Sequence, residues 1–376
     1  MSSSFTSIPL IDLSLASSPE TRPSLLRQLH HALTAVGFLY VSNHGVPESV
    51  ISHLVSALPV FFSLPQEAKE EIALCNSPWF LGYSAVGAET TAGRQDRREQ
   101  VEFATEVEGQ EEERERRWVE GKGEGEERPV YERLFGGRNQ WPSQFPALRP
   151  IVEAYMRELT ALGERFLRLV AEALSLPPDT FFPFLSDQHR LKLVRYPGIP
   201  TSTSSSTTST STTSTETITT IQGVGPHKDS SGWWTFLLQA SPPEIKGLQA
   251  LNRDGEWIDV PAIPGTFVVN IGQAFEVVTH GVCRATTTAF VPFFQGVRGS
   301  LTKAEAVGTL AEHFRSMGGG WDEEGESGER AKIDAPFLKG KYDTWGEAQL
   351  RTKIRSHRDV GRRFYADVYE KYVNDD

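Results

Sequence analysis

The sequence predicts a helical N-terminal region, a β-rich core of the sandwich or barrel type, such as a jelly roll, and a helical C-terminal extension. In the first half of the chain apolar residues recur at helical spacing. From about residue 191 the pattern changes to short β-branched and aromatic runs separated by Pro, Gly and Asp. A length of 376 residues suits one large domain or two ordinary ones.

Charge and composition exclude several classes of protein. The net charge of −11 argues against a nucleic-acid partner, because phosphate binding needs clustered Lys and Arg. No apolar run approaches the ~18 residues of a membrane span, so we expect no membrane partner. The N-terminus has no basic segment before a long apolar core, and Cys75 and Cys283 cannot make a disulfide framework. We therefore expect a cytoplasmic protein.

Strand and helix signals alternate in the N-terminal region. The string IPLIDLS predicts a short strand, and Gly37 ends the helix that follows it. A doubly wound fold is disfavoured because no Gly-rich phosphate loop follows either early strand. The elements expected are helices over 21–36, 48–62 and 147–174 and a strand over 38–41.

Two segments have compositions that do not suit a packed core. Residues 106–128 hold ten Glu against five Lys or Arg, which predicts a solvated loop. Residues 201–217 contain almost only Ser and Thr, which predicts a disordered insertion.

Strand signals dominate the core, and helical spacing returns at the C-terminus. Trp233 and Trp234 alternate along one strand, so we expect one in the core and the other facing the pocket. The strands expected are 192–196, 233–239, 247–251, 257–260, 266–271 and 289–294, and the helical segment is 343–372.

The string GPHKDS, residues 225–230, carries the most chemical information. In a strand, His227 and Asp229 point to the same face because side chains alternate. An imidazole and a carboxylate that converge form two thirds of the facial triad that holds non-haem Fe(II). By itself this pattern also suits a solvated strand face.

An ordered series of strings across most of the chain strengthens the metal interpretation. These are IPLIDLS, GFLYVSNHGVP, GYSAVGAETTAGRQDRREQVEF, LVRYP, HKDSSGWWTFLLQ and GLQALNRDGEWIDVPAIPGTFVVNIGQAFEVVTHGVCRATT. Together they resemble the isopenicillin N synthase-like branch of the 2-oxoglutarate/Fe(II)-dependent dioxygenases. The resemblance implies a double-stranded β-helix (jelly-roll) core, with boundaries at 1–185 for the N-terminal region, 186–300 for the core and 301–376 for the C-terminal extension.

The resemblance also implies an iron centre held by a HxD…H triad, with 2-oxoglutarate anchored by an Arg-x-Ser pair. His227 and Asp229 match the first two ligands. The third would stand near Thr288, but Thr287 runs almost directly into TAFVPFF. The distal His, the loop after it and the cosubstrate Arg are therefore expected to be missing. The metal centre is the only catalytic group implied.

Two residues could substitute for the missing groups. His280 follows His227 by 53 residues, although its register places it in a turn, so we favour a surface turn residue over a ligand. Arg284 could pair with a carboxylate, but a strand-end surface residue is the favoured interpretation.

Other candidates lie around the expected barrel mouth. Tyr196 resembles the family's tyrosine that contacts a substrate or cosubstrate carboxylate, and a half-buried strand tyrosine is an equal alternative. Arg98 lies in a region that often lines the substrate entrance, but we favour an exposed, salt-bridged pair with Arg97. His44 is interpreted as a turn and packing residue. Cys283 has no His–Asp partner and is not expected to be a nucleophile.

The resemblance implies an oxidoreductase that hydroxylates, desaturates or cyclises a small organic substrate, often a natural product of secondary metabolism. Its cofactor and cosubstrates would be Fe(II), 2-oxoglutarate and O2, and ascorbate can accompany them. The departure near Thr288 leaves two alternatives. One is a catalytically inactive jelly-roll binding protein. The other is a version of an active dioxygenase that lacks an internal segment.

Overall fold

The computed structural model describes residues 4–91, 94–106, 129–198, 223–229, 232–287, 293–319, 336–339 and 342–374. The acidic segment 107–128 and the Ser/Thr tract therefore lie outside the described residues, as do residues 288–292, where the third ligand was expected.

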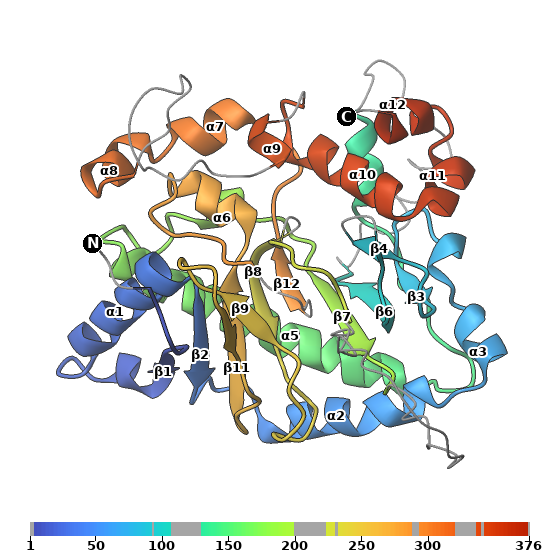
Figure 1. Cartoon of the computed structure of the whole chain (residues 1–376), viewed down its shortest axis with the longest axis horizontal. Coiled ribbons are helices and arrows are strands. Elements are labelled where there is room, and N and C mark those ends of the chain that lie inside the picture. The colour runs from blue at the N-terminus through green and yellow to red at the C-terminus, as the bar shows by residue number, and fades with distance from the viewer. Residues whose placement is uncertain are drawn as a thin grey trace, which may run out of the picture.

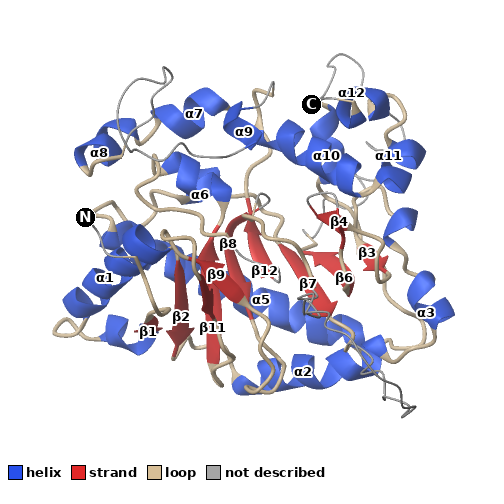
Figure 2. Cartoon of the chain, in the orientation of Figure 1, coloured by secondary structure: helices blue, strands red, loops and turns tan. Residues whose placement is uncertain are grey.

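An eight-stranded mixed sheet forms the centre of the molecule, in the order β1-β2-β11-β8-β12-β7-β6-β3 (Figure 2). Only the β1–β2 pair is parallel; the other neighbours are antiparallel. The strands are β1 (Leu10–Asp12), β2 (Phe38–Ser42), β3 (Gly82–Ser84), β6 (Glu99–Ala104), β7 (Arg190–Arg195), β8 (Gly232–Leu237), β11 (Thr266–Ile271) and β12 (Phe293–Gly296). Two short antiparallel pairs stand apart from it: β9 (Gln249–Leu251) with β10 (Trp257–Asp259), and β4 (Thr90–Thr91) with β5 (Arg94–Gln95).

Strands from the N-terminal region complete both edges of this sheet. β2 pairs with β11 on one side, and β6 pairs with β7 on the other. The sheet therefore runs across the boundary expected near residue 185, and the N-terminal region packs as part of the same core. The boundaries of the three regions remain predictions.

The helices lie around the sheet, with the C-terminal ones gathered at one end (Figure 1). The segment expected to be helical over 343–372 is divided into α10, α11 and α12. The helices are α1 (Arg22–His31), α2 (Glu48–Phe62), α3 (Gln66–Glu70), α5 (Leu148–Ala173), α6 (Gln273–Val278), α7 (Lys303–Gly308), α8 (Ala311–Ser316), α9 (Pro336–Lys339), α10 (Trp345–Ser356), α11 (Arg358–Phe364) and α12 (Tyr369–Val373). A π-helical turn, η2 (Ala32–Val36), extends α1 to Gly37.

The long helix α5 covers one face of the sheet, and β9 lies on the other face (Figure 1). The apolar stripe of α5 follows its 3.6-residue period, as its spacing predicted, and Phe166 contacts the rings of Trp234 and Phe236 edge to face. On the opposite face Leu237 and Val268 pack with Ala250 of β9 in a separate apolar cluster. The space between the sheet and β9 is thus the interior of the jelly roll.

The expectation that one of the two tryptophans faces a pocket is wrong. Trp233 and Trp234 are each 0% exposed. Trp233 stacks on Phe184, and Trp234 lies against Phe275. Both faces of β8 are covered at this end of the strand, so alternation places both rings in packed surroundings.

Gly37 joins η2 to β2 at a point where only glycine fits. Its φ is +78°, and a Cβ there would lie 2.3 Å from the Arg284 carbonyl oxygen and 2.5 Å from Thr286 Oγ1. The absence of a side chain therefore allows the segment after α6 to pack against the start of β2.

We expect Gly37→Ala to lower the free energy of unfolding by about 3 kcal/mol or more, because left-handed strain and a backbone clash act together. Gly87→Ala is the matched control. Gly87 has the same φ of +78°, but its nearest neighbour would be 3.9 Å from the Cβ. Gly87→Ala should lower the free energy of unfolding by about 1–2 kcal/mol, from the left-handed strain alone. Urea unfolding of both variants measures the difference, and equal losses would contradict the packing argument.

Candidate metal centre

Asp229 is held against the sheet from the interior of the jelly roll. Its side chain accepts hydrogen bonds at Oδ2 from Thr235 Oγ1 of β8, at 2.6 Å, and from Asn270 Nδ2 of β11, at 2.7 Å. Its backbone carbonyl accepts a bond from the amide of Gln273 at the start of α6. The carboxylate is therefore fixed by two neighbouring strands and one helix, and the residue is only 7% exposed.

The other carboxylate oxygen, Oδ1, faces the ring of His227. The two atoms Asp229 Oδ1 and His227 Nε2 are 3.6 Å apart. His227 Nδ1 lies 2.9 Å from the carbonyl oxygen of Gly225, which can only accept, so Nδ1 carries the proton and Nε2 presents its lone pair. Among the described residues Oδ1 has no hydrogen-bond partner, although it is buried.

This donor set fits a divalent cation. A buried carboxylate oxygen without a hydrogen bond is costly unless a cation or donor satisfies it. A histidine that donates one ring nitrogen to a carbonyl and leaves the other free has the tautomer of a metal ligand. Burial raises the pKa of Asp229, but the neighbouring His227 and the hydrogen bonds from Thr235 and Asn270 outweigh it, so the pKa is lowered overall. The carboxylate is ionised at neutral pH and available as a ligand.

A third protein ligand is not found in the part of the chain that the structure describes, where no three His, Cys, Asp or Glu side chains form a metal-binding group. All nine histidines of the chain fall in the described ranges. His280 lies in the expected turn, with φ of +53°, and its Nε2 bonds the Val307 carbonyl at 2.8 Å. It is 2% exposed, so the expectation of a surface residue is wrong.

Arg98 is buried within a group of charges and is not part of an exposed pair. Its guanidinium forms ion pairs with Glu89 at 2.9 Å and Asp96 at 3.0 Å, and its exposure is 6%. Arg97 alone is exposed, so the expected pair is wrong for Arg98. The sequence gives little sign of this arrangement, because it is the pairing of β4 with β5 that brings Glu89 close to Arg98.

Tyr196 stands beside this group, just after β7. Burial raises its pKa to about 12, and the neighbouring Arg98 opposes that shift. Gly223 packs closely on the Tyr196 ring, and its carbonyl accepts a hydrogen bond from the Arg97 amide. The segment that carries His227 therefore begins against the Tyr196 ring and the backbone of Arg97, next to this group of charges.

His44 packs in a turn, and Cys283 lies in the core. The His44 ring packs 4.6 Å from the ring of Phe267, centroid to centroid, and its Nδ1 accepts a bond from the Val46 amide. Cys283 is buried, and burial raises the pKa of its thiol.

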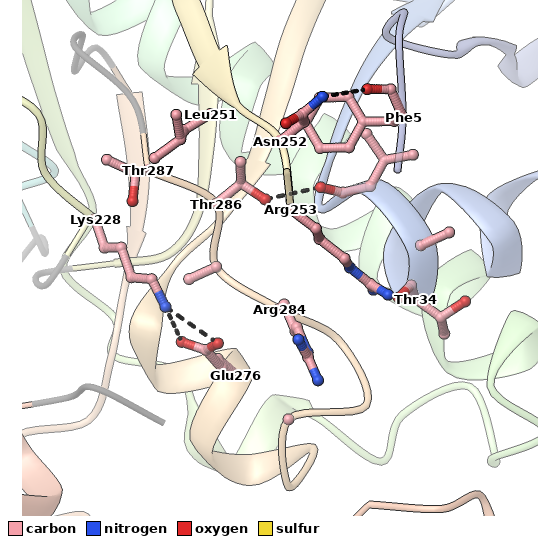
Figure 3. Close-up of a pocket in the computed structure, with 14 residues that line it drawn as sticks. Phe5, Thr34, Lys228, Leu251, Asn252, Arg253, Glu276, Arg284, Thr286 and Thr287 are labelled. Carbon is pink, nitrogen blue, oxygen red and sulfur yellow. Dashed lines mark hydrogen bonds and ion pairs between the residues drawn. The ribbon is translucent and has the colours of Figure 1, made fainter. Parts of the chain in front are cut away.

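A pocket of about 190 Å3 opens beside the His227 segment, between the end of β9 and the chain after α6 (Figure 3). Arg284 lines it and is half-buried, whereas the sequence favoured a surface residue at the end of a strand. The sequence did not single out Lys228, Arg253 or Glu276, which also line the pocket. Only the fold brings these four residues together.

Comparison with known families identifies the class. Residues 8–144 match the model described as non-haem dioxygenase in morphine synthesis N-terminal, and residues 179–297 match the 2OG-Fe(II) oxygenase superfamily. The chain belongs to the 2-oxoglutarate/Fe(II)-dependent oxygenases, and its fold is the double-stranded β-helix of that family. Members are oxidoreductases that use Fe(II), 2-oxoglutarate and O2.

Particular relatives cover nearly the whole chain. The 2-oxoglutarate-dependent dioxygenase frbJ of Dothideomycetidae sp. (strain 11243) is 38% identical over 96% of this chain and 92% of that protein. A 2-oxoglutarate-dependent dioxygenase of Gibberella zeae is 31% identical over 98% and 94%, respectively. The crystal structure of a full-length Neurospora crassa protein in complex with alpha-KG and thymine covers 96% of this chain and 97% of its own, with a TM-score of 0.61. Its 19% identity supports the fold alone.

None of the described helices is both long and apolar enough to cross a membrane.

The buried group around Glu89 predicts a pH-dependent stability. Burial disfavours its charge, yet Lys192, His357 and Arg98 hold the pKa of Glu89 at about 2. The contribution of Glu89 to the free energy of unfolding is therefore complete above its usual pKa of 4.5 and is lost as the pH falls towards 2. We expect Glu89→Gln to lower the free energy of unfolding by about 3 kcal/mol at pH 7 and by progressively less at pH 4 and pH 3.

Urea unfolding at the three pH values measures this loss. Glu153→Gln on the exposed face of α5 is the control, where the pair with Arg149 should contribute less than about 1 kcal/mol. A loss for Glu89→Gln that does not change with pH would contradict the electrostatic explanation.

Proposed function

We propose that this chain is a 2-oxoglutarate- and Fe(II)-dependent oxygenase of a small organic substrate and that His227 and Asp229 are its own iron ligands. The observation that carries the proposal is the buried Asp229 Oδ1, which faces His227 Nε2 and has no hydrogen-bond partner among the described residues. The family membership supports the reaction class.

Bound iron would supply the activation of O2 that couples oxidative decarboxylation of 2-oxoglutarate to oxidation of the substrate. The protein's part is positional. Thr235 and Asn270 hold Oδ2 of Asp229, which turns Oδ1 towards the metal position. The Gly225 carbonyl favours the His227 tautomer with its proton on Nδ1, which leaves the Nε2 lone pair for the metal position.

Only two ligands come from this pair, which leaves more of the coordination sphere to other groups than a three-ligand site does. A carboxylate can occupy a vacant position on a two-ligand centre. This arrangement makes the metal affinity depend strongly on the geometry of the two residues, because the described residues offer no third ligand to compensate for either.

We expect His227→Ala and Asp229→Ala each to abolish Co(II) binding at micromolar concentration and Fe(II)-dependent formation of succinate from 2-oxoglutarate. Calorimetry and a labelled-succinate assay measure the two effects. His53→Ala, an exposed residue of α2, is the matched control. His280→Asn should also retain metal, because the His280 ring already bonds the Val307 carbonyl.

Two results would contradict the proposal. If the wild-type chain binds no Co(II) or Fe(II) at micromolar concentration and forms no succinate, it is a binding protein that retains the fold alone. If His280→Asn abolishes binding while His227→Ala does not, the metal lies elsewhere.

The residues behind the carboxylate provide a second test. Thr235→Val and Asn270→Ala should each weaken Co(II) binding about 10–100-fold, because partners that orient a ligand usually contribute that much to metal affinity. Thr266→Val is the control, since Thr266 lies on the same strand as Asn270 and bonds the Ile263 carbonyl instead. Unchanged affinity in both variants would show that the orientation of Asp229 does not matter.

A further inference from the structure

The pocket beside the His227 segment carries an excess of positive charge. Lys228 pairs with Glu276 of α6 at 3.1 Å, so these two charges cancel (Figure 3). Arg253 and Arg284 also line the pocket. In the part of the chain that the structure describes, no carboxylate oxygen lies within ion-pair distance of either guanidinium, and the charge of Arg284 acts on Glu276 from farther away. The pocket therefore retains about two positive charges at neutral pH.

The two arginines are close enough to repel each other. Burial lowers the pKa of Arg253, and the charge of Arg284 lowers it further. Such a pair of like charges is unfavourable unless an anion lies between or beside them. Guanidinium groups also match carboxylates in geometry, because their N–H groups form parallel pairs of hydrogen bonds.

The side chain of Arg253 and the backbone after Arg284 are held in place. Arg253 Nη2 donates to the Thr34 carbonyl at 3.0 Å. The chain after Arg284 is tied at two points: the Leu251 amide donates to the Thr287 carbonyl, and Thr286 Oγ1 donates to the Val36 carbonyl. The pocket is thus built by β9, η2 and the segment after α6, and an anion would meet donors that are already positioned.

The rest of the lining limits the size and chemistry of a ligand. Phe5, Val36 and Leu251 supply apolar surface, and Thr287 lies next to them. The volume of about 190 Å3 is below the ~300–1,000 Å3 of pockets for drug-sized ligands, so it suits a short organic acid. Lys228 lies between His227 and Asp229 in the chain, and neither of these two residues lines the pocket, so the pocket is a site distinct from the candidate metal centre.

We propose that Arg253 and Arg284 bind the carboxylate of a small organic acid in this pocket. The carboxylate can belong to 2-oxoglutarate or to the organic substrate, since both would present the same group to the guanidinium pair. The link to oxidation rests on the proposed function, whereas carboxylate binding can be measured without any turnover.

The test uses the full chain and titrates 2-oxoglutarate, hexanoate and hexanamide by calorimetry. Hexanamide has the size of hexanoate without its charge, so it should not bind. We expect Arg253→Gln and Arg284→Gln each to weaken binding of a carboxylate about tenfold or more, as loss of a charge-assisted pair predicts. Arg157→Gln, an exposed arginine of α5, is the matched control and should change nothing.

The pattern of losses identifies the source of the carboxylate. Weaker binding of 2-oxoglutarate assigns the pocket to the cosubstrate, and weaker binding of hexanoate alone assigns it to an organic substrate. Arg253→Lys and Arg284→Lys keep the charge and should recover part of the affinity, while melting temperatures check that each variant is folded.

Two outcomes would overturn the proposal: the wild type binds neither acid, or both glutamine variants bind each acid as the wild type does. His227→Ala, measured in parallel without added metal, should retain carboxylate binding. Loss of metal binding in that variant with carboxylate binding intact separates this proposal from the proposed iron site. Carboxylate binding at the arginines and metal binding at His227 and Asp229 are therefore tested separately, and failure of one does not imply failure of the other.

Discussion

The buried carboxylate of Asp229 is the constraint around which the centre of the molecule is arranged. One of its oxygens receives hydrogen bonds from two strands, and its backbone carbonyl receives one from α6. One oxygen is satisfied twice while the other has no donor among the described residues, and the proposed cation would complete the set. The registry of β8 and β11, which places Thr235 opposite Asn270, is what brings the two donors to the same oxygen.

A second set of buried charges joins the C-terminal extension to the other half of the sheet. Glu102 of β6 is 0% exposed and accepts bonds from Arg190 of β7 and Lys353 of α10. Burial disfavours the charge of Glu102, but Lys353, Lys192 and Arg190 hold its pKa well below the usual range. A buried acid with three cations around it fixes α10 to the sheet, because removing any partner leaves an uncompensated charge.

These two charged groups use the sheet in different ways. Around Asp229 one carboxylate oxygen receives no hydrogen bond from the described residues, as a metal-ligand site requires. Around Glu102 the protein's own cations neutralise the carboxylate, as a structural contact requires. The arginines at the pocket that Lys228 lines resemble the first case, because Glu276 is the one carboxylate in the lining and it already pairs with Lys228.

The sequence by itself determined β1, α1 with η2, β2, α2 and α5 and singled out the pair His227 and Asp229, whereas the strands β3 and β6 were not predicted. Periodic apolar positions, Gly37 and the HxD spacing are local signals, and local physics decides what they form. The family resemblance added the jelly-roll core. The tertiary structure decided the burial of both tryptophans, the ion pairs of Arg98 and the meeting of Arg253 with Arg284. Those depend on contacts between residues far apart in the chain, and neither periodicity nor composition records which distant side chains will meet.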